Sequence, residues 1–238
     1  YKRQICAFIH RVDPDIIDMQ EVLHHQLEVL KTGLPEYTVV GVGREDGKTA
    51  GEYAPIFFKQ AKYTLLDQNT FWLCEKPDSV GMVGWDAALT RIATWVKLQD
   101  KKTGQILMVV NTHFDHIGTE ARRNSALLII EKIKEIVGTS PAILTGDFNV
   151  SEDWDAYKTI TNNEFILKDA HKVAGKRTGV DFTYHDFGKI PAEKCEKIDF
   201  IFVTPQIRVI SSYIPFSQLN DTLFLSDHNP EIVELEIK

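Results

Sequence analysis

Carboxylate, amide and imidazole side chains recur in this sequence at the ends of strongly apolar runs. The set comprises Glu21, His113, Asp147, Asn149, Asp199, Asp227 and His228. Polar side chains at the ends of several strands can converge on one cleft, because the strands supply rigidity and the loops supply access. We therefore expect these residues to form one active site.

The expected site is rich in oxygen ligands. Such hard ligands suit Mg²⁺ or Mn²⁺, whereas a zinc or copper site would need several histidines or cysteines at close spacing. The three cysteines, Cys6, Cys74 and Cys195, lie far apart and indicate neither a disulfide framework nor a zinc motif. Hydrolysis of a phosphate ester needs a proton acceptor for water, a group that neutralises charge at phosphorus, and help for the departing alkoxide. The set offers a candidate for each role.

The spacing of apolar residues indicates which elements position these side chains. Helical spacing predicts a first helix that stops before the Asp-Pro pair at 13–14, a long helix over 119–137 that ends at Gly138, and a short helix near 154–160. Strands are expected in the runs DIIDMQEV (with Glu21 at its end), IFFK, KYTLL, residues 87–98, ILMVVNTH, PAILTGDFN, KIDFIFV, IRVISSYI and EIVELEIK. The segment 173–179 is expected to be a flexible surface loop. Because no linker or repeat interrupts the pattern, residues 1–238 are predicted to form a single α/β domain of mostly antiparallel strands.

The charge balance limits the classes of partner. Lys and Arg number 27 against 34 Asp and Glu, which gives a net charge of −7. No basic run forms the positive face that tight non-specific nucleic-acid binding requires. A bound cation can still make an acidic cleft attractive to an anionic substrate. No apolar run approaches the roughly 18 residues of a membrane span, and neither the oligomeric state nor a cytoplasmic or exported location follows from the sequence.

Five motifs in a fixed order carry a family resemblance. DIIDMQEV, NTH, GDFN, KIDFIFV and SDHNP, which together span almost the whole chain, resemble the motifs of the endonuclease/exonuclease/phosphatase superfamily. The resemblance implies a deoxyribonuclease-like four-layer α/β sandwich, in which two mixed β-sheets pack together, helices cover them, and the active site lies at one end. The family usually begins with a strand that ends in a metal-binding Asn. No counterpart precedes the first helix here, so the resemblance predicts that this N-terminal strand is missing.

The resemblance also implies catalytic roles. Asp147 in GDFN resembles the residue that orients or deprotonates the attacking water, and Asn149 resembles the residue that contacts the phosphate. His228 in SDH matches the histidine that contacts the scissile phosphate. Asp199 in KIDF matches the acid that holds this histidine cationic, which agrees with the rise in pKa that a carboxylate causes in a neighbouring histidine.

Metal-binding and substrate-binding roles follow from the same resemblance. Glu21 in QEV and Asp227 resemble metal-binding carboxylates. His113 in NTH resembles the second phosphate-facing histidine, and Glu52 occupies the place of a carboxylate that orients it. Arg91 occupies the place of an arginine that contacts substrate phosphate in nuclease members, a task that suits its forked guanidinium group.

Three functions remain open from the sequence. The first is a metal-dependent phosphodiesterase with nuclease-like activity, 3′–5′ exonuclease activity included, whose partner would be a nucleic acid or nucleotide. The second is a phosphomonoesterase of a sugar, inositol or lipid phosphate, and the third is a binding module without catalysis. Outside the motifs, His171 and His185 are expected at the surface or in loops, and Trp85 is expected in the core or at the rim, with a stacking wall as the alternative. Asp115 and His116 either line the cleft or cap the following helix.

Overall fold

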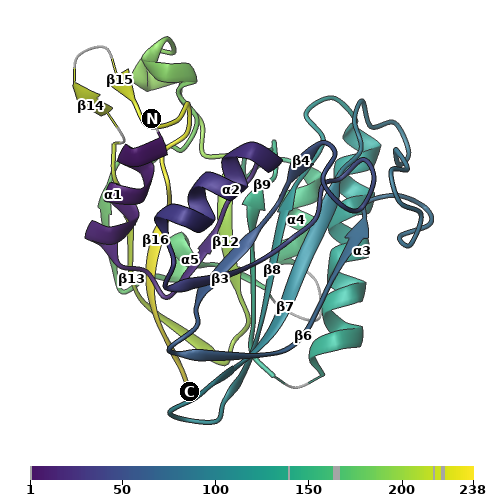
Figure 1. Ribbon diagram of the computed structural model, residues 1–238. Coiled ribbons are helices and arrows are strands. Elements are labelled where there is room, and N and C mark those ends of the chain that lie inside the picture. The colour runs from purple at the N-terminus through teal and green to yellow at the C-terminus, as the bar shows by residue number, and fades with distance from the viewer. Residues whose placement is uncertain (1, 139, 163–166, 217, 221–222) are drawn as a thin grey trace.

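The computed structural model describes residues 2–138, 140–162, 167–216, 218–220 and 223–238, and a six-stranded sheet forms the centre of this mixed α/β fold (Figure 1). Its strand order is β10-β12-β9-β8-β7-β6. The strands are β6 (Tyr63–Trp72), β7 (Ile92–Asp100), β8 (Ile106–His113), β9 (Ala142–Asp147), β10 (Lys168–Asp169) and β12 (Asp199–Val203). β8 and β9 pair in parallel, and the other neighbours pair in antiparallel fashion.

Two three-stranded sheets accompany the central sheet, with the orders β1-β5-β3 and β11-β13-β16. Their strands are β1 (Ile16–Asp18), β3 (Tyr37–Val40), β5 (Ile56–Lys59), β11 (Lys176–Gly179), β13 (Ile207–Ile214) and β16 (Ile232–Ile237). Two short pairs complete the sheets: β2 (Val22–Leu23) with β4 (Glu52–Tyr53), and β14 (Gln218–Asn220) with β15 (Leu223–Phe224).

The three longest helices flank the sheets. α3 (Thr119–Val137) runs along one side of the molecule, whereas α1 (Lys2–Val12) and α2 (His24–Gly33) lie on the other (Figure 1). The remaining helical elements are α4 (Asp155–Thr161), α5 (Ala170–Val173) and the short turns η1 (Asp186–Gly188) and η2 (Ala192–Lys194). No helix in the described part of the chain is long and apolar enough to cross a membrane.

Alternation along the central strands divides the interior into separate cores. Met108 and Val110 of β8 pack in a core with α3 and α4, whereas Leu107 and Val109 pack in a second core with residues of β5, β13 and β16. This is the two-residue period of a strand whose two faces are both buried. A third core joins α1 and α2 to the β1-β5-β3 sheet. The central sheet is therefore held from both faces, which fixes the strand ends that carry the polar motifs.

Several expectations from the sequence are confirmed. The first helix ends at Val12, directly before the Asp-Pro pair. The long helix spans Thr119–Val137, and Gly138 follows it with the positive φ of 59° that glycine adopts most readily. Mostly antiparallel pairing is also confirmed, with β8–β9 and β11–β13 as the parallel pairs among the described strands.

Other expectations are wrong. The strand in DIIDMQEV ends at Asp18, so Glu21 lies beyond it in a left-handed turn (φ 59°), and the strand expected from residue 87 begins at Ile92. Part of the expected loop is strand β11, an exposed edge whose polar residues show no apolar alternation. His171 lies in a short helix, at Ala170–Val173, and is buried, so neither a surface nor a loop position holds for it. His185 lies in a loop as expected, but it too is buried.

Phe148 anchors the segment between Asp147 and Asn149. Its ring is fully buried and meets the rings of Phe114 and Phe202 edge-on, at centroid distances of 4.9 and 5.2 Å. We expect Phe148→Ala to lower the free energy of unfolding by about 3–5 kcal/mol, because it leaves a cavity in the core. Urea unfolding measures this loss. The exposed Leu66→Ala is the control, with an expected change below about 0.5 kcal/mol, and a Phe148→Ala loss as small as the control's would contradict the anchoring role.

Candidate active site

Three candidate residues lie in one row across three neighbouring strands. His113 at the end of β8 is in register with Asp147 at the end of β9, and Asp147 is in register with Asp199 at the start of β12. Side chains at opposed positions of adjacent strands lie close together on the same face of the sheet. The pairing of β8, β9 and β12 therefore brings together residues that are 34 and 52 positions apart in sequence.

His228 reaches this row from the loop before β16. Its Nδ1 lies 2.7 Å from Asp199 Oδ2, and its Nε2 lies 3.9 Å from Asp147 Oδ2. Burial alone lowers the pKa of His228, but Asp199, through its charge and its hydrogen bond, and then Asp147 and Asp227 outweigh that effect and raise the pKa to about 9. At neutral pH this imidazole is therefore cationic.

Asp147 is a buried carboxylate among several polar groups. Its Oδ1 accepts a hydrogen bond from the backbone N–H of Asn149 at 2.9 Å, and its Oδ2 lies 3.5 Å from His113 Nε2. Burial, followed by the charge of Asp199, raises the pKa of Asp147 above its ordinary value, so this group holds a proton more readily than a free carboxylate. Asn149 adopts a left-handed conformation (φ 49°), and its Nδ2 donates to the Phe114 carbonyl and lies 3.2 Å from His113 Nε2.

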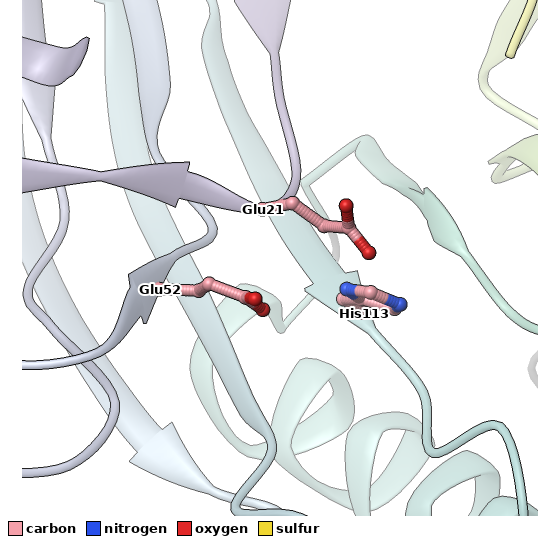
Figure 2. Close-up of side chains that lie close together, drawn as sticks. All are labelled: Glu21, Glu52 and His113. Carbon is pink, nitrogen blue, oxygen red and sulfur yellow. The ribbon is translucent and has the colours of Figure 1, made fainter. Parts of the chain in front are cut away.

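Glu21, Glu52 and His113 form the candidate metal centre. One ligand atom from each lies within 4.8 Å of those of the other two, and Figure 2 shows the three side chains converging. Burial, then the charges of Glu52 and Asp227, raise the pKa of Glu21. Carboxylates crowded in this way are relieved by a divalent cation, so the donor set fits Mg²⁺ or Mn²⁺. Asp227 lies outside the close group but contributes charge to it.

Asn111 positions Glu21, a function that the motifs did not reveal. Its Oδ1 accepts from Gln20 Nε2 at 2.7 Å, and its Nδ2 donates to the carbonyls of Met19 and Pro55. Asn111 is fully buried. The amide thus ties the turn before Glu21 to β8, two residues before His113.

Two arginines provide positive charge beside His113. Arg91 is 4% exposed, and its Nε and Nη1 have no hydrogen-bond partner among the described residues, although Nε lies 3.5 Å from Asp115. Arg44, which the sequence reasoning missed, pairs with Glu52. Burial, then the charges of Arg91 and Arg44, lower the pKa of His113 well below its usual range. His113 is therefore neutral and able to bind a cation.

Asp115 anchors the loops that carry Arg91 and His116. Its carboxylate accepts hydrogen bonds from the backbone N–H groups of Ala88, Leu89, Ile117 and Gly118. Arg91 Nη2 lies 3.2 Å from His116 Nδ1, so His116 lies beside the arginine that the sequence singled out. Trp85 lines a separate hollow along α3 with Leu127 and Lys132.

The Asp115→Asn variant is expected to lose about 2–3 kcal/mol of folding free energy at pH 7. The amide NH₂ of asparagine cannot accept hydrogen bonds, so some of the backbone N–H groups that now bind the carboxylate would lose their acceptor. Burial raises the pKa of Asp115, but the four backbone donors outweigh it and lower the pKa to about 2. The carboxylate's stabilisation is thus present above the ordinary value of 3.8 and is lost as pH falls towards 2. Urea unfolding should show a smaller difference in the free energy of unfolding between variant and wild type at pH 3 than at pH 7. An equal difference at both pH values would show that the ionised carboxylate is not the source of the stabilisation.

The sequence and fold identify the family. A model of the endonuclease/exonuclease/phosphatase family matches residues 1–228. The chain belongs to this family. An endonuclease/exonuclease/phosphatase family protein of Bacteroides vulgatus is 63% identical in sequence, with a TM-score of 0.97 over 100% of this chain and 90% of that one. The chain is accordingly a metal-dependent phosphoesterase of the endonuclease/exonuclease/phosphatase family, with a candidate metal site.

Relatives within the family differ in the activities for which they are named. A mannosyl-6-phosphatase of Bacteroides thetaiotaomicron is 36% identical, with a TM-score of 0.92 over 99% of this chain and 90% of that one. A probable RNA exonuclease of Saccharomyces cerevisiae is 26% identical over 77% of this chain, which spans only 39% of that protein. The more similar of these two relatives is named for a phosphatase, and the more distant one for a nuclease.

Proposed function

We propose that this protein is a phosphomonoesterase that releases phosphate from a phosphorylated sugar. One observation carries the proposal: the 36% identity to a mannosyl-6-phosphatase that extends over 99% of the chain. The sequence placed a sugar phosphatase second and a nuclease-like phosphodiesterase first. The nuclease hypothesis is now supported only by more distant relatives, such as the probable RNA exonuclease at 26% identity.

The charges beside His113 support a monoester substrate. A terminal phosphate carries up to two negative charges at neutral pH, whereas each phosphate of a diester carries one. Arg91 has two buried nitrogens without a hydrogen-bond partner among the described residues, and Arg44 lies in the same positive region. Guanidinium groups bind phosphate oxygens in forked geometry. This arrangement suits a dianionic phosphate, while the net charge of −7 disfavours a long polyanion.

In the proposed mechanism Asp147 accepts the proton of the attacking water as the water oxygen bonds to phosphorus. The bond between phosphorus and the sugar oxygen breaks, the sugar oxygen takes up a proton from solvent water, and Asp147 returns its proton to solvent, so the products are inorganic phosphate and the sugar alcohol. His228, kept cationic by Asp199, stabilises negative charge on the transferring phosphoryl group. Asn149 and Arg91 hold its other oxygens, with neutral His113 beside them.

Glu21, Glu52 and His113 would hold the divalent cation, with Asp227 adding negative charge nearby. When bound, Mg²⁺ or Mn²⁺ would neutralise phosphate charge and lower the barrier to attack. Glu52 would then bind the cation and pair with Arg44. It would also orient His113, as the family resemblance implies.

We also infer that the three cores separate the layers of a four-layer sandwich, with the two three-stranded sheets facing the central sheet and helices outside, in one domain over residues 1–238. A binding module without catalysis is disfavoured, because His113, Asp147, Asp199 and His228 stand together with the acidic group at Glu21.

The test measures hydrolysis of four substrates with Mg²⁺, Mn²⁺ or EDTA: phosphate release from mannose 6-phosphate and p-nitrophenyl phosphate, p-nitrophenol release from bis(p-nitrophenyl) phosphate, and shortening of a short oligoribonucleotide. We expect metal-dependent cleavage of the monoesters at higher kcat/KM than of either diester. Glu21→Gln should weaken Mg²⁺ binding by at least about 10–100-fold, the range seen when even an outer-shell partner is lost. Faster cleavage of the oligoribonucleotide would instead establish the nuclease hypothesis, and silence with all four substrates would favour the binding module.

A further inference from the structure

A second groove adjoins the proposed phosphate site. It has a volume of about 650 Å³ and lies between the first turns of α3 and α4, where Asp86, Thr119, Glu120, Arg122, Arg123, Val150, Asp153, Trp154, Asp155 and Ala156 line it. Val150 follows Asn149 directly, and Arg122 Nη1 donates to the carbonyl of Asp115, the residue next to His116. The groove thus shares chain segments with the phosphate site. Its volume falls within the about 300–1,000 Å³ of small-molecule sites.

Trp154 forms a rigid aromatic surface in this groove. The side chain is 44% exposed, although exposed tryptophan is uncommon. Its backbone N–H donates to the Ser151 carbonyl, and its own carbonyl accepts from Lys158, so the residue is held at the start of α4. The guanidinium of Arg122 lies 5.0 Å from the ring centroid. One part of the indole is therefore packed, and the rest is open to the groove.

Arg122 leaves hydrogen-bonding capacity unused beside this surface. The residue is 4% exposed, and its Nε has no hydrogen-bond partner among the described residues, whereas Nη1 and Nη2 reach Asp115 and Thr119. A buried donor without a partner costs free energy, which a ligand acceptor can recover. A ligand oxygen is therefore the expected partner of Arg122.

The charges of the lining exclude a second anion. Four carboxylates, those of Asp86, Glu120, Asp153 and Asp155, outnumber the two guanidinium groups of Arg122 and Arg123. Such a surface repels a phosphodiester backbone. It suits a neutral polyol, because carboxylates accept hydrogen bonds from hydroxyl groups, a guanidinium donates to ring and hydroxyl oxygens, and the C–H face of a pyranose packs on an indole.

From these observations we propose that the groove around Trp154 is a sugar-binding subsite, which holds a hexose unit of the phosphorylated carbohydrate while its phosphate lies at Arg91 and His228. The proposal rests on the proposed function and names the part of the substrate that gives specificity. Trp154 packs against the sugar ring, and Arg122 Nε and the Asp153 carboxylate bind its oxygens.

The test compares mannose 6-phosphate with p-nitrophenyl phosphate, which carries no sugar. We expect Trp154→Ala to lower the ratio of kcat/KM for mannose 6-phosphate to kcat/KM for p-nitrophenyl phosphate by about tenfold, mainly through KM, as expected when an aromatic anchor is truncated. Leu127→Ala, at a similarly exposed position (48%) in the separate hollow beside Trp85, is the control and should keep the wild-type ratio. An unchanged ratio in Trp154→Ala, or an equal fall in both variants, overturns the subsite.

A binding measurement separates failure of the subsite from failure of the proposed function. Calorimetric titration with neutral mannotriose should show binding to wild type and to Leu127→Ala, and none to Trp154→Ala. If the wild-type protein cleaves p-nitrophenyl phosphate but no sugar phosphate, the proposed function is refuted. The titration then tests whether the groove binds a sugar, independently of that function. If wild type then fails to bind mannotriose, the subsite is overturned. If wild type binds mannotriose and Trp154→Ala does not, the subsite is supported.

Discussion

We expect the Asp147→Asn variant to lose on the order of 10³-fold in kcat, while its KM for a phosphate monoester changes little. Asn has nearly the same size as Asp and can still accept the hydrogen bond from Asn149 N–H, so the geometry of the row with His113 and Asp199 is kept. It cannot accept a proton from water. Steady-state phosphate release from p-nitrophenyl phosphate with saturating Mg²⁺ measures the effect.

The stability of the same variant supplies the control. The pKa of Asp147 is raised in the folded protein, so its ionised form costs folding free energy as pH rises above its unfolded value of 3.8. Asn removes this cost. In EDTA at pH 8 the variant should therefore be more stable to urea than wild type, even though it is inactive. If the variant is both inactive and less stable, Asp147 is needed for the structure rather than for proton transfer. If the variant is active, Asp147 is not the proton acceptor.

The second large effect is expected for Asp199→Asn, as a change in pH dependence. In wild type, kcat/KM should fall as pH rises through about 9, where His228 loses its proton. Without the Asp199 carboxylate, burial lowers the pKa of His228 from about 9 towards the ordinary value of 6.5, although Asp147 and Asp227 still oppose this fall. A histidine with a pKa of 6.5 is only about 3% protonated at pH 8, so activity there should fall by up to roughly 30-fold, with a much smaller loss at pH 6.

A pH–rate profile from 5 to 10 at saturating Mg²⁺ distinguishes this electrostatic effect from a general loss of function. The exposed Asp67→Asn on β6 removes a carboxylate far along the sequence from Asp199 and His228 and should leave the alkaline limb at its wild-type pH. A uniform loss for Asp199→Asn at every pH would mean that the carboxylate positions His228 without setting its charge.

The sequence predicted best where one local signal decides the structure. Helical spacing and a terminal glycine defined α3 to the residue, and the charged motifs named the residues that now surround His113 and Asp147. The left-handed turn that places Glu21 has no such signal, because it depends on Asn111, about 90 residues away. Strand β11 has exposed polar residues and is defined by its pairing with β13 alone.

Two charged residues show what the sequence could and could not reveal. Arg44 was missed, because its role depends on its pairing with Glu52 and on its charge beside His113. The sequence leaves Asp115 open between lining the cleft and capping the next helix. Its hydrogen bonds to the N–H groups of Ile117 and Gly118 are local, whereas those to Ala88 and Leu89 join a separate loop. The contacts of this second kind are made only in the finished fold, so spacing along the chain does not show them.

The row formed by His113, Asp147 and Asp199 has a consequence for the protein during its synthesis. The register of β8, β9 and β12 sets all three positions at once, and a slip of one residue would turn each side chain to the opposite face. A nascent chain that has left the ribosome only as far as Asp147 has neither Asp199 nor His228 beside this carboxylate. If the proposed mechanism holds, catalysis begins only after His228 has emerged and the row has formed, so shorter nascent chains should not hydrolyse phosphate esters.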